Sequence, residues 1–289
     1  MFKRIVICGV GLIGGSFALA LRKAGLVEQL VGMGRTRAPL EAALALGVID
    51  VIATDWESAL ADADLVLLGM PVGQMLPVMQ AMQPYLAPGT IVTDAGSTKC
   101  GVVLAARMAF GERIAQFVPA HPIAGAEKSG VEAARVDLYA GKRVVLTRLS
   151  ENAANSVAVV RAAWQACGAA VSELSAEEHD QIFAAVSHLP HLLAFSLVHE
   201  FLMRPNADQL FGFAASGFRD FTRIASSHPE MWRDICLDNR QSLIAELDAY
   251  LAELMRARVL LAKADGPGLE AMFSLARERR DAWLAAQRY

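Results

Sequence analysis

A glycine-rich turn near the start of the chain constrains the fold more than any other feature. The sequence GVGLIGGS follows the apolar run RIVIC directly and matches G-x-G-x-x-G through Gly9, Gly11 and Gly14. The first glycine permits a tight turn, the second lets the backbone approach a pyrophosphate, and the third lets a helix pack closely on a strand. The N-terminus of that helix also favours an anion. The predicted dinucleotide-binding residues here are Gly9, Gly11, Leu12, Ile13 and Gly14.

The first half of the chain alternates short apolar runs with helical patterns. This alternation predicts a parallel sheet with crossover helices. The predicted strands are residues 4–10, 29–34, 63–72, 90–96, 113–121 and 142–147, with helical periodicity at 15–25 and 74–86. A helix at about 151–167 and a strand at 169–174 complete the unit. We therefore expect an α/β Rossmann-type N-terminal domain over residues 1–174.

The remainder, residues 175–289, shows helical patterns alone and predicts an all-α C-terminal domain. No Gly/Ser-rich or Pro-rich linker precedes it, so we expect the two domains to pack closely. Its longest predicted helix runs from Gln241 to about Lys263. One stripe of this helix carries Leu243, Leu247, Leu251, Leu254 and Leu261. Such a stripe indicates either an intramolecular core or a homodimer that shares a helical core.

Composition narrows the class of protein. The chain has 27 Lys and Arg against 30 Asp and Glu, and no basic stripe with interleaved aromatic residues, which disfavours nucleic acid as a partner. Residues 1–21 begin like a signal peptide, but the dinucleotide turn explains their glycines and no clean cleavage site follows. No uninterrupted apolar run approaches the roughly 20 residues that span a bilayer. We expect a soluble, cytoplasmic protein.

The cysteines are scattered, and none forms a C-x-x-C pair or stands at ligand spacing from a histidine. They are Cys8, Cys100, Cys167 and Cys236. We expect free thiols, with neither disulfides nor a metal site.

Two polar motifs fall where predicted strands end. They are TDAGSTK at 93–99 and HPIAGAEKSG at 121–130. Open parallel sheets bind ligands at the carboxyl ends of their strands. His121, stiffened by the adjacent proline, is well placed to meet a bound nicotinamide. The alternative is that His121 caps a loop and Ser97 caps the following helix.

The helical half supplies further candidates in the motifs EEHDQ, SHLPH and GFRDFTRIA. His188 and His191 are three residues apart and could share a helix face, while Pro190 between them marks a kink or a first turn. A lone histidine in an apolar setting is usually a core residue. Two of them beside a proline, in a chain with a cofactor half, predict a pocket at the domain junction.

Taken together, these motifs resemble the prephenate/arogenate dehydrogenases of tyrosine biosynthesis, essentially from end to end. The resembling segments are GVGLIGGS, DAGSTK, HPIAGAEKSGVE, HDQIFAAVSHLPH, GFRDFTRIA and MWRDI. The resemblance implies an oxidative decarboxylation of a cyclohexadienol: C4 gives a hydride to the nicotinamide, its hydroxyl loses a proton, and the ring loses CO2 and becomes aromatic. It implies His121 as the catalytic base, a role that suits imidazole, with Ser97 near the hydroxyl and the nicotinamide. The oxidised ring is its own electron sink, so no metal is required.

The resemblance also implies how the two substrate carboxylates are held. Arg223 supplies a planar fork for a carboxylate and His191 contacts an acidic substituent. Other positions implied near the site are His179, Glu127, Asp220 and Trp232, with Glu127 as part of a charged gate. His188 is expected to be structural. Relatives commonly have Ser or Thr where this chain has Ala126, which leaves the choice between prephenate and arogenate open.

The end of the second predicted strand indicates the cofactor. An Asp or Glu at this place accepts hydrogen bonds from the ribose of NAD. Here the place falls on Gly34, followed by Arg35, Thr36 and Arg37. Arg35 and Thr36 can bind a 2′-phosphate, so we expect NADP, with NAD as the alternative.

Two other functions compete with this one. Dehydrogenases of the 3-hydroxyacid or imine-reducing families typically place a catalytic lysine early in the second domain, where this chain has His179, His188 and His191 instead. The other alternative is a non-catalytic dinucleotide-sensing protein. Such a protein need not keep a catalytic base and a group that binds carboxylates, so the joint presence of Ser97, His121, His191 and Arg223 argues against it.

Overall fold

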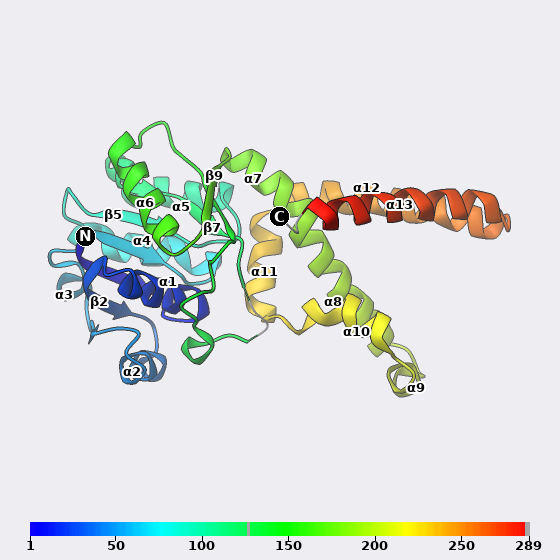
Figure 1. The fold of residues 1–289 in the computed structure, drawn as a ribbon, viewed down its shortest axis with the longest axis horizontal. Coiled ribbons are helices and arrows are strands. Elements are labelled where there is room, and N and C mark those ends of the chain that lie inside the picture. Colours follow the sequence, from blue (N-terminus) through cyan, green and yellow to red (C-terminus); the bar gives the residue numbers. More distant parts are fainter. Residues whose placement is uncertain (126–127, 287–289) are drawn as a thin grey trace. The chain divides into compact units, whose positions relative to one another are not determined.

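The apolar runs of the first half form a six-stranded parallel sheet in the order β3-β2-β1-β4-β5-β6 (Figure 1). The computed structural model describes residues 1–125 and 128–286. The strands are β1 (Phe2–Cys8), β2 (Val27–Met33), β3 (Val51–Ile52), β4 (Leu65–Leu68), β5 (Ile91–Asp94) and β6 (Phe117–Val118). The strand order reverses between β1 and β4, which is the switch point at which Rossmann folds bind dinucleotides. The predicted fold class is confirmed.

Helices cover both faces of this sheet. Because successive side chains of a strand point to opposite faces, Ile5 and Ile7 of β1 join one buried cluster while Val6 and Cys8 join another. The first cluster includes residues of α1 (Leu12–Lys23), α2 (Arg37–Ala45) and α6 (Ala154–Ala166). The second includes residues of α3 (Trp56–Leu60), α4 (Met75–Met82) and α5 (Cys100–Phe110). Burial on both faces explains why the strands lack polar alternation.

A second, three-stranded sheet corrects two predictions. The strands expected at 142–147 and 169–174 form, but they lie in this sheet and not in the parallel one. The expected strand 113–121 is instead a 3₁₀ helix, η3 (Gly111–Gln116), followed by two short strands, β6 and β7 (Ala120–Pro122). Pro119 separates them, because proline has no N–H to donate to a continuing ladder. β7 leaves the parallel sheet and pairs antiparallel with β8 (Arg143–Leu146), which pairs in turn with β9 (Ala170–Glu173).

The helical half begins with a capping box. Ser175 accepts a hydrogen bond from the backbone N–H of Glu178, whose side chain accepts one from the backbone N–H of Ser175. The helices that follow are α7 (Ala176–Phe183), the π-helical turn η5 (Ala184–His188), α8 (Leu189–Leu202), α9 (Ala207–Gly212), α10 (Ser216–Thr222), the 3₁₀ turn η6 (Arg223–Ser226) and α11 (Pro229–Asp238). Pro190 lies in the first turn of α8, where a helix tolerates proline.

The chain divides into two compact units, Met1–Arg240 and Gln241–Tyr289. The expected domain boundary after residue 174 falls between β9 and α7, inside the first unit, and stays a prediction. The long helices are α12 (Arg240–Ala262) and α13 (Gly266–Ala286). Leu243 is buried, but Leu251, Leu254 and Leu261 are 49%, 47% and 65% exposed. An intramolecular core therefore does not explain this part of the leucine stripe.

One continuous helical run, residues 176–202, is long and apolar enough to cross a membrane by those criteria alone. The same run carries His179, Asp180 and His188, all buried and hydrogen-bonded within the first unit. Core helices of globular proteins meet the same criteria, so the run is weak evidence for a span.

Candidate active site

The glycine turn has the geometry that a dinucleotide requires. Gly9 has φ +90°, and a Cβ there would lie 2.9 Å from the backbone of Gly69. A Cβ at Gly14 would lie 2.4 Å from the carbonyl oxygen of Gly9, so this close approach of helix and strand needs glycine. Around Gly11, by contrast, no atom in the described part of the chain lies within 4 Å of where a Cβ would be. That open backbone and the N-terminus of α1, which starts at Leu12, fit a pyrophosphate.

The loop after β2 offers cationic and hydroxyl groups to the same cofactor. β2 ends at Met33, and Gly34, Arg35 and Thr36 are exposed. Thr36 precedes α2 without a capping hydrogen bond from its side chain. Arg37 pairs with Glu41 at 2.7 Å, whereas Arg35 has no hydrogen bond or ion pair within residues 1–125 and 128–286.

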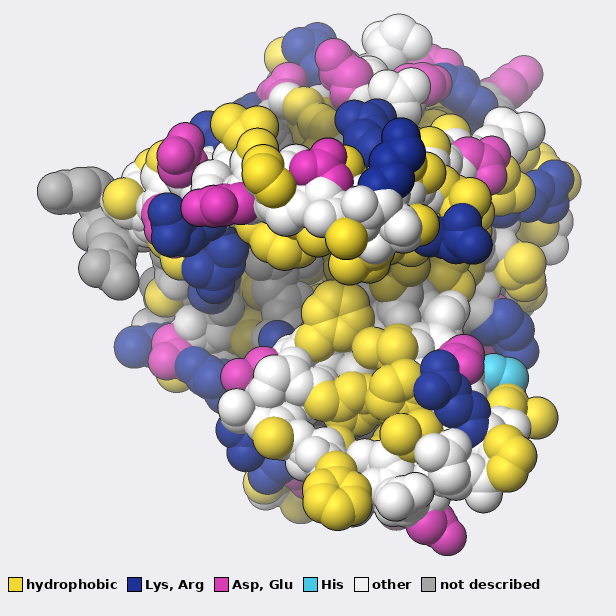
Figure 2. All heavy atoms as spheres, turned by 90° about the vertical axis from the view of Figure 1, so that its right-hand side faces the viewer, with side chains coloured by type: hydrophobic (Ala, Val, Ile, Leu, Met, Phe, Trp, Pro, Cys, Tyr) yellow, Lys and Arg dark blue, Asp and Glu magenta, His cyan; other side chains and the backbone are white. Residues whose placement is uncertain are grey.

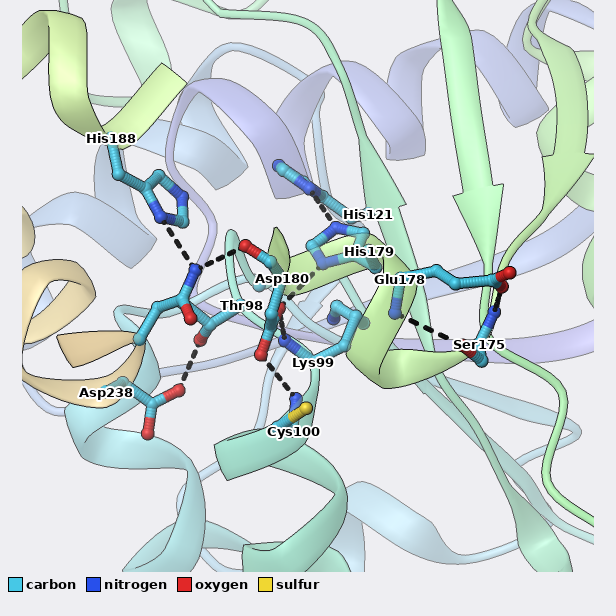
Figure 3. A network of polar contacts seen from close by, with 12 residues as sticks. Thr98, Lys99, Cys100, His121, Ser175, Glu178, His179, Asp180, His188 and Asp238 are labelled. Carbon is cyan, nitrogen blue, oxygen red and sulfur yellow. Dashed lines mark hydrogen bonds and ion pairs between the residues drawn. The ribbon is translucent and has the colours of Figure 1, made fainter. Parts of the chain in front are cut away.

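Three elements bring a chain of buried polar side chains together (Figure 3). Nδ1 of His121, on β7, lies 2.8 Å from Nε2 of His179 on α7. Nδ1 of His179 lies 2.7 Å from Oδ1 of Asp180. The Asp180 carboxylate accepts the backbone N–H groups of Lys99 at 2.7 Å and of Cys100 at 2.8 Å, at the start of α5. β7, α7 and α5 thus meet at one hydrogen-bonded chain.

A buried ion pair holds the backbone beside His121. Lys99 and Asp94 pair with no exposed side-chain surface. Nζ of Lys99 also donates to the carbonyl oxygen of Ala120 at 2.8 Å, and the backbone N–H of Ala120 donates to Oδ1 of Asp94 at 3.0 Å. The N–H and the carbonyl group of Ala120 are therefore both hydrogen-bonded to this ion pair.

Burial, together with the charge of Lys99, keeps His121 neutral. Burial lowers the pKa of His121 well below its ordinary value, and His179, Lys99 and His188 lower it further. Burial tends to raise the pKa of Asp180, but the hydrogen bonds from His179 and the backbone of Cys100 and Lys99 bring it below its usual range. The ring of His121 is therefore neutral, and the Asp180 carboxylate, on the far side of His179, is charged.

His188 joins the same network from the π-helical turn. The side-chain amide of Asn239 donates to the carbonyl oxygen of Asp180 at 2.7 Å and lies 3.1 Å from Nδ1 of His188. Burial, above all, lowers the pKa of His188 to about 4. Its Nε2 has no hydrogen-bond partner among the residues that the structure describes. The structural role expected for His188 stays a prediction.

A second group of candidates lies on α8, η6 and α11. The rings of His191 and Trp232 stack with centroids 3.5 Å apart and planes at 17°. Nδ1 of His191 donates to the carbonyl oxygen of Ser187 at 2.9 Å. Burial lowers the pKa of His191, and the charge of Arg223 lowers it further against the effect of Ser187. Arg223 lines a pocket of about 530 Å³ together with Phe218, Arg219, Asp220, Thr222 and Ser226.

Other predicted positions are less informative. Ser97 is half-buried between β5 and α5, and its hydroxyl makes no hydrogen bond in the described ranges. Glu127 and Ala126 lie outside the described residues. No group of three or more His, Cys, Asp or Glu side chains suited to a metal occurs in the part of the chain described.

Sequence reasoning missed four members of the buried network. Asp180, Lys99, Asp94 and Asn239 each hold His121 or its neighbours through hydrogen bonds. Asp180 follows His179 in EEHDQ, and Asp94 and Lys99 both stand in TDAGSTK. The acidic residue directly after the candidate His179 was the sequence signal that could have identified Asp180 as its partner.

A neutral, buried imidazole in a chain with a dinucleotide-binding turn suits the oxidation of an alcohol, because a proton and a hydride must both leave the substrate. The fold and site therefore define a nicotinamide-dependent dehydrogenase with a Rossmann half and a helical half. Residues 17–173 match the family model of the prephenate dehydrogenase nucleotide-binding domain, and residues 175–275 match that of the prephenate dehydrogenase dimerization domain. The chain belongs to the prephenate dehydrogenase family.

Individual relatives cover nearly all of the chain. It is 37% identical to the prephenate dehydrogenase of Bacillus subtilis, over 97% of this chain and 76% of that one. It is 35% identical to the cyclohexadienyl dehydrogenase of Zymomonas mobilis, over 97% and 96%. The structure of prephenate dehydrogenase from A. aeolicus in complex with hydroxyphenyl propionate and NAD+ has a TM-score of 0.90 and 35% identity, covering 98% of this chain and 99% of that one.

An arogenate-specific name also occurs among the similar structures. Synechocystis arogenate dehydrogenase superposes with a TM-score of 0.81 at 27% identity, covering 97% of this chain and all of that one. The chain is thus an oxidoreductase whose reaction is an oxidative decarboxylation with a nicotinamide cofactor.

Proposed function

We propose that the protein converts prephenate, arogenate or both into 4-hydroxyphenylpyruvate or tyrosine. The observation that carries this proposal is the neutral His121 at the end of a buried hydrogen-bonded chain. The names of the relatives, which include prephenate, cyclohexadienyl and arogenate dehydrogenases, support the substrate class.

His121 removes the proton of the C4 hydroxyl. The bound nicotinamide supplies the hydride acceptor. As the C4 oxygen becomes a carbonyl, the electrons of the bond to the ring carboxylate move into the ring and CO2 leaves. The resulting aromatic phenolate takes a proton, which protonated His121 can return, and becomes a phenol. Ser97, in the loop after β5, donates a hydrogen bond near the reacting hydroxyl. Because the pKa of His121 is lowered, its ring is unprotonated at neutral pH and can accept a proton.

His191 and Arg223 hold the acidic groups of the substrate, and Trp232 supplies an apolar wall behind His191. A guanidinium fork suits a carboxylate. His179 is a different case from the one expected: its two ring nitrogens lie against His121 and Asp180, so we propose that it supports His121 and does not touch the substrate. The gate assigned to Glu127 stays a prediction.

The cofactor is NADP in this proposal. Gly34 leaves space for a 2′-phosphate, and the exposed Arg35 and Thr36 supply a charge and a hydroxyl beside it. The A. aeolicus relative was solved with NAD+, and the ratio of kcat/KM for NADP and for NAD tests the preference proposed for this chain.

The protein is a homodimer through its helical half. α12 and α13 expose large hydrophobic side chains. On the face drawn in Figure 2, hydrophobic side chains lie at the surface among charged ones. The most exposed on these two helices are Ile244, Met255, Leu261, Phe273, Leu275 and Trp283. The second family model is named as a dimerization domain, which supports a second copy as the occupant. Sedimentation equilibrium at micromolar concentration tests this, and a monomer would contradict it.

The cellular location follows from the proposed role. An enzyme of amino-acid biosynthesis is expected in the cytoplasm, and fractionation of cells with an antibody to the protein tests that location.

An absorbance assay of nicotinamide reduction tests the activity itself. Prephenate and arogenate are each paired with NAD and NADP. We expect turnover in at least one combination, fastest with NADP. No turnover in all four would contradict the proposal.

A further inference from the structure

We propose that Asp180 and His179 fix the tautomer of His121, placing a proton on its Nδ1 and leaving Nε2 as the basic lone pair. This inference rests on the proposed role of His121 as base. It makes His179 and Asp180 positioning residues, because both act through His121.

The direction of the hydrogen bonds starts at Asp180. The backbone N–H groups of Lys99 and Cys100 can only donate, and both end on the Asp180 carboxylate, one on each oxygen. These hydrogen bonds favour the ionised form and hold the pKa of Asp180 below its usual range, and an ionised carboxylate has no proton to give. The contact with His179 at 2.7 Å therefore requires that Nδ1 of His179 donates.

The remaining steps follow from the two-nitrogen chemistry of imidazole. A neutral ring with a proton on one nitrogen accepts through the other. Nε2 of His179 thus accepts, and the partner at 2.8 Å, Nδ1 of His121, must donate. The second nitrogen of His121, Nε2, carries the lone pair. This chain of hydrogen bonds from Asp180 through His179 to His121, here called the relay, selects the tautomer of His121 before any substrate binds.

The surroundings keep His179 neutral, which the relay requires. A doubly protonated His179 would donate from both nitrogens and would reverse the proton on His121. Burial lowers the pKa of His179, and the charge of Lys99 does the same, while Asp180 and Asp94 act in the opposite direction. The ring of Phe183 packs against His121 and His179, with centroids at 5.0 and 4.5 Å, and supplies no polar group.

The main chain of His121 has a separate support. The Lys99–Asp94 pair holds Ala120 through its N–H and its carbonyl group. Substitutions that change the hydrogen bonds of His179 or Asp180 therefore leave Ala120 of β7 bound to the Lys99–Asp94 pair. This separation makes a tautomer experiment practical on folded, full-length protein.

The test is to measure the ¹⁵N shifts of the His121 ring by two-bond proton–nitrogen correlation, in the full chain without substrate at neutral pH. The His121→Asn variant identifies the signals. We expect a protonated, pyrrole-like Nδ1 and an unprotonated, pyridine-like Nε2. A protonated Nε2 in the wild type would overturn the proposal, whatever the variants do.

Asp180→Leu removes the acceptor that faces His179. The Nδ1–H of His179 is then no longer held, so the tautomer of His121 should no longer be fixed and the wild-type shift pattern should be lost. We expect kcat to fall, by up to the roughly 10²–10⁴-fold loss of a base held in the wrong tautomer, with the KM values for substrate and for cofactor within a few-fold of wild type. Should that variant not fold, His179→Phe removes the same hydrogen bonds and should also lose the wild-type shift pattern.

Phe183→Leu is the control, because it changes the packing of both rings and none of the hydrogen bonds. We expect the tautomer of His121 to stay as in the wild type. A tautomer that changes with Phe183→Leu, or that survives loss of the relay, contradicts the inference. The shifts are read without substrate, so a failed assay with prephenate and arogenate would remove the proposed function while leaving the tautomer result intact.

Discussion

Lys99 and Asp94 form a fully buried ion pair that holds both backbone polar groups of the residue before His121. Lys99 also places its own backbone N–H on Asp180, so one loop supports the candidate base from two sides. The loop lies at the carboxyl end of β5, where a Rossmann fold presents its ligand-binding groups. The same residues therefore serve the stability of the fold and the placement of His121.

Lys99→Met should be strongly destabilising. Removal of one partner of a buried pair leaves an uncompensated charge on Asp94, at a cost of about 3–5 kcal/mol in the free energy of unfolding. Urea denaturation measures the change. Lys3→Met, at the exposed pair with Asp62, is the control and should have little effect. Equal stability of the two variants would show that the buried pair does not hold the loop.

Arg223→Ala should raise the KM of the substrate far more than it lowers kcat. A carboxylate clamp acts about equally on the bound substrate and on the transition state, so its loss appears as weaker binding. Steady-state kinetics with prephenate and with arogenate measures both parameters. The exposed Arg204, paired with Glu200 on α8, gives a control variant, Arg204→Ala, with unchanged kinetics. An unchanged KM together with a lower melting temperature would assign Arg223 a structural role.

The tautomer of His191 predicts a pH dependence of binding. Its Nδ1–H is held by the carbonyl of Ser187, so Nε2 can donate to a carboxylate only when the ring is protonated. Since burial lowers the pKa of the free ring, binding must take up a proton. The KM should therefore rise with pH above that pKa, by up to about tenfold per unit.

An ammonium group facing His191 would reverse this expectation, because a neutral Nε2 can accept its hydrogen bond. The pH profile of KM, compared between prephenate and arogenate, thus reports which group meets His191. In His191→Asn the rise should disappear. A pH-dependent KM that persists unchanged in His191→Asn would exclude His191 as its source.

Arg35→Ala should reduce the preference for NADP over NAD, judged by the ratio of the two kcat/KM values. Loss of one hydrogen bond to a charged phosphate corresponds to about 1.5–3 kcal/mol, or roughly 10–100-fold. Arg37→Ala is the matched control, because Arg37 is paired with Glu41. A wild type that prefers NAD, or a ratio that Arg35→Ala leaves unchanged, would refute the assignment.

The sequence predicted the parts of the fold that local chemistry determines. Gly9 and Gly14 of GVGLIGGS each have a steric reason, and the open backbone at Gly11 leaves room for a pyrophosphate. Buried strands reveal themselves as apolar runs such as Leu65–Leu68. The single strand expected over 113–121 failed at Pro119, where β7 turns to an antiparallel partner. Which strand a segment pairs with depends on residues far along the chain, and no local pattern records it.

Candidate residues of the site could be named from the sequence, but the hydrogen bonds between them could not. His121 and His179 were both expected near the site, but their hydrogen bond joins residues 58 positions apart. The direction of that bond depends on Asp180 and on two backbone N–H groups of a third segment. Hydrogen-bond polarity of this kind requires coordinates, and it changed the role that we propose for His179 from substrate contact to support.

His121→Asn tests the central claim most directly, and its measurement is kcat together with the affinity for NADP. Asparagine keeps a polar side chain on β7 but cannot take a proton. We expect kcat to fall by about two to four orders of magnitude, while calorimetric titration gives a Kd for the cofactor within a few-fold of wild type. A His121→Asn enzyme with nearly wild-type kcat would show that another group removes the proton, and would contradict the account.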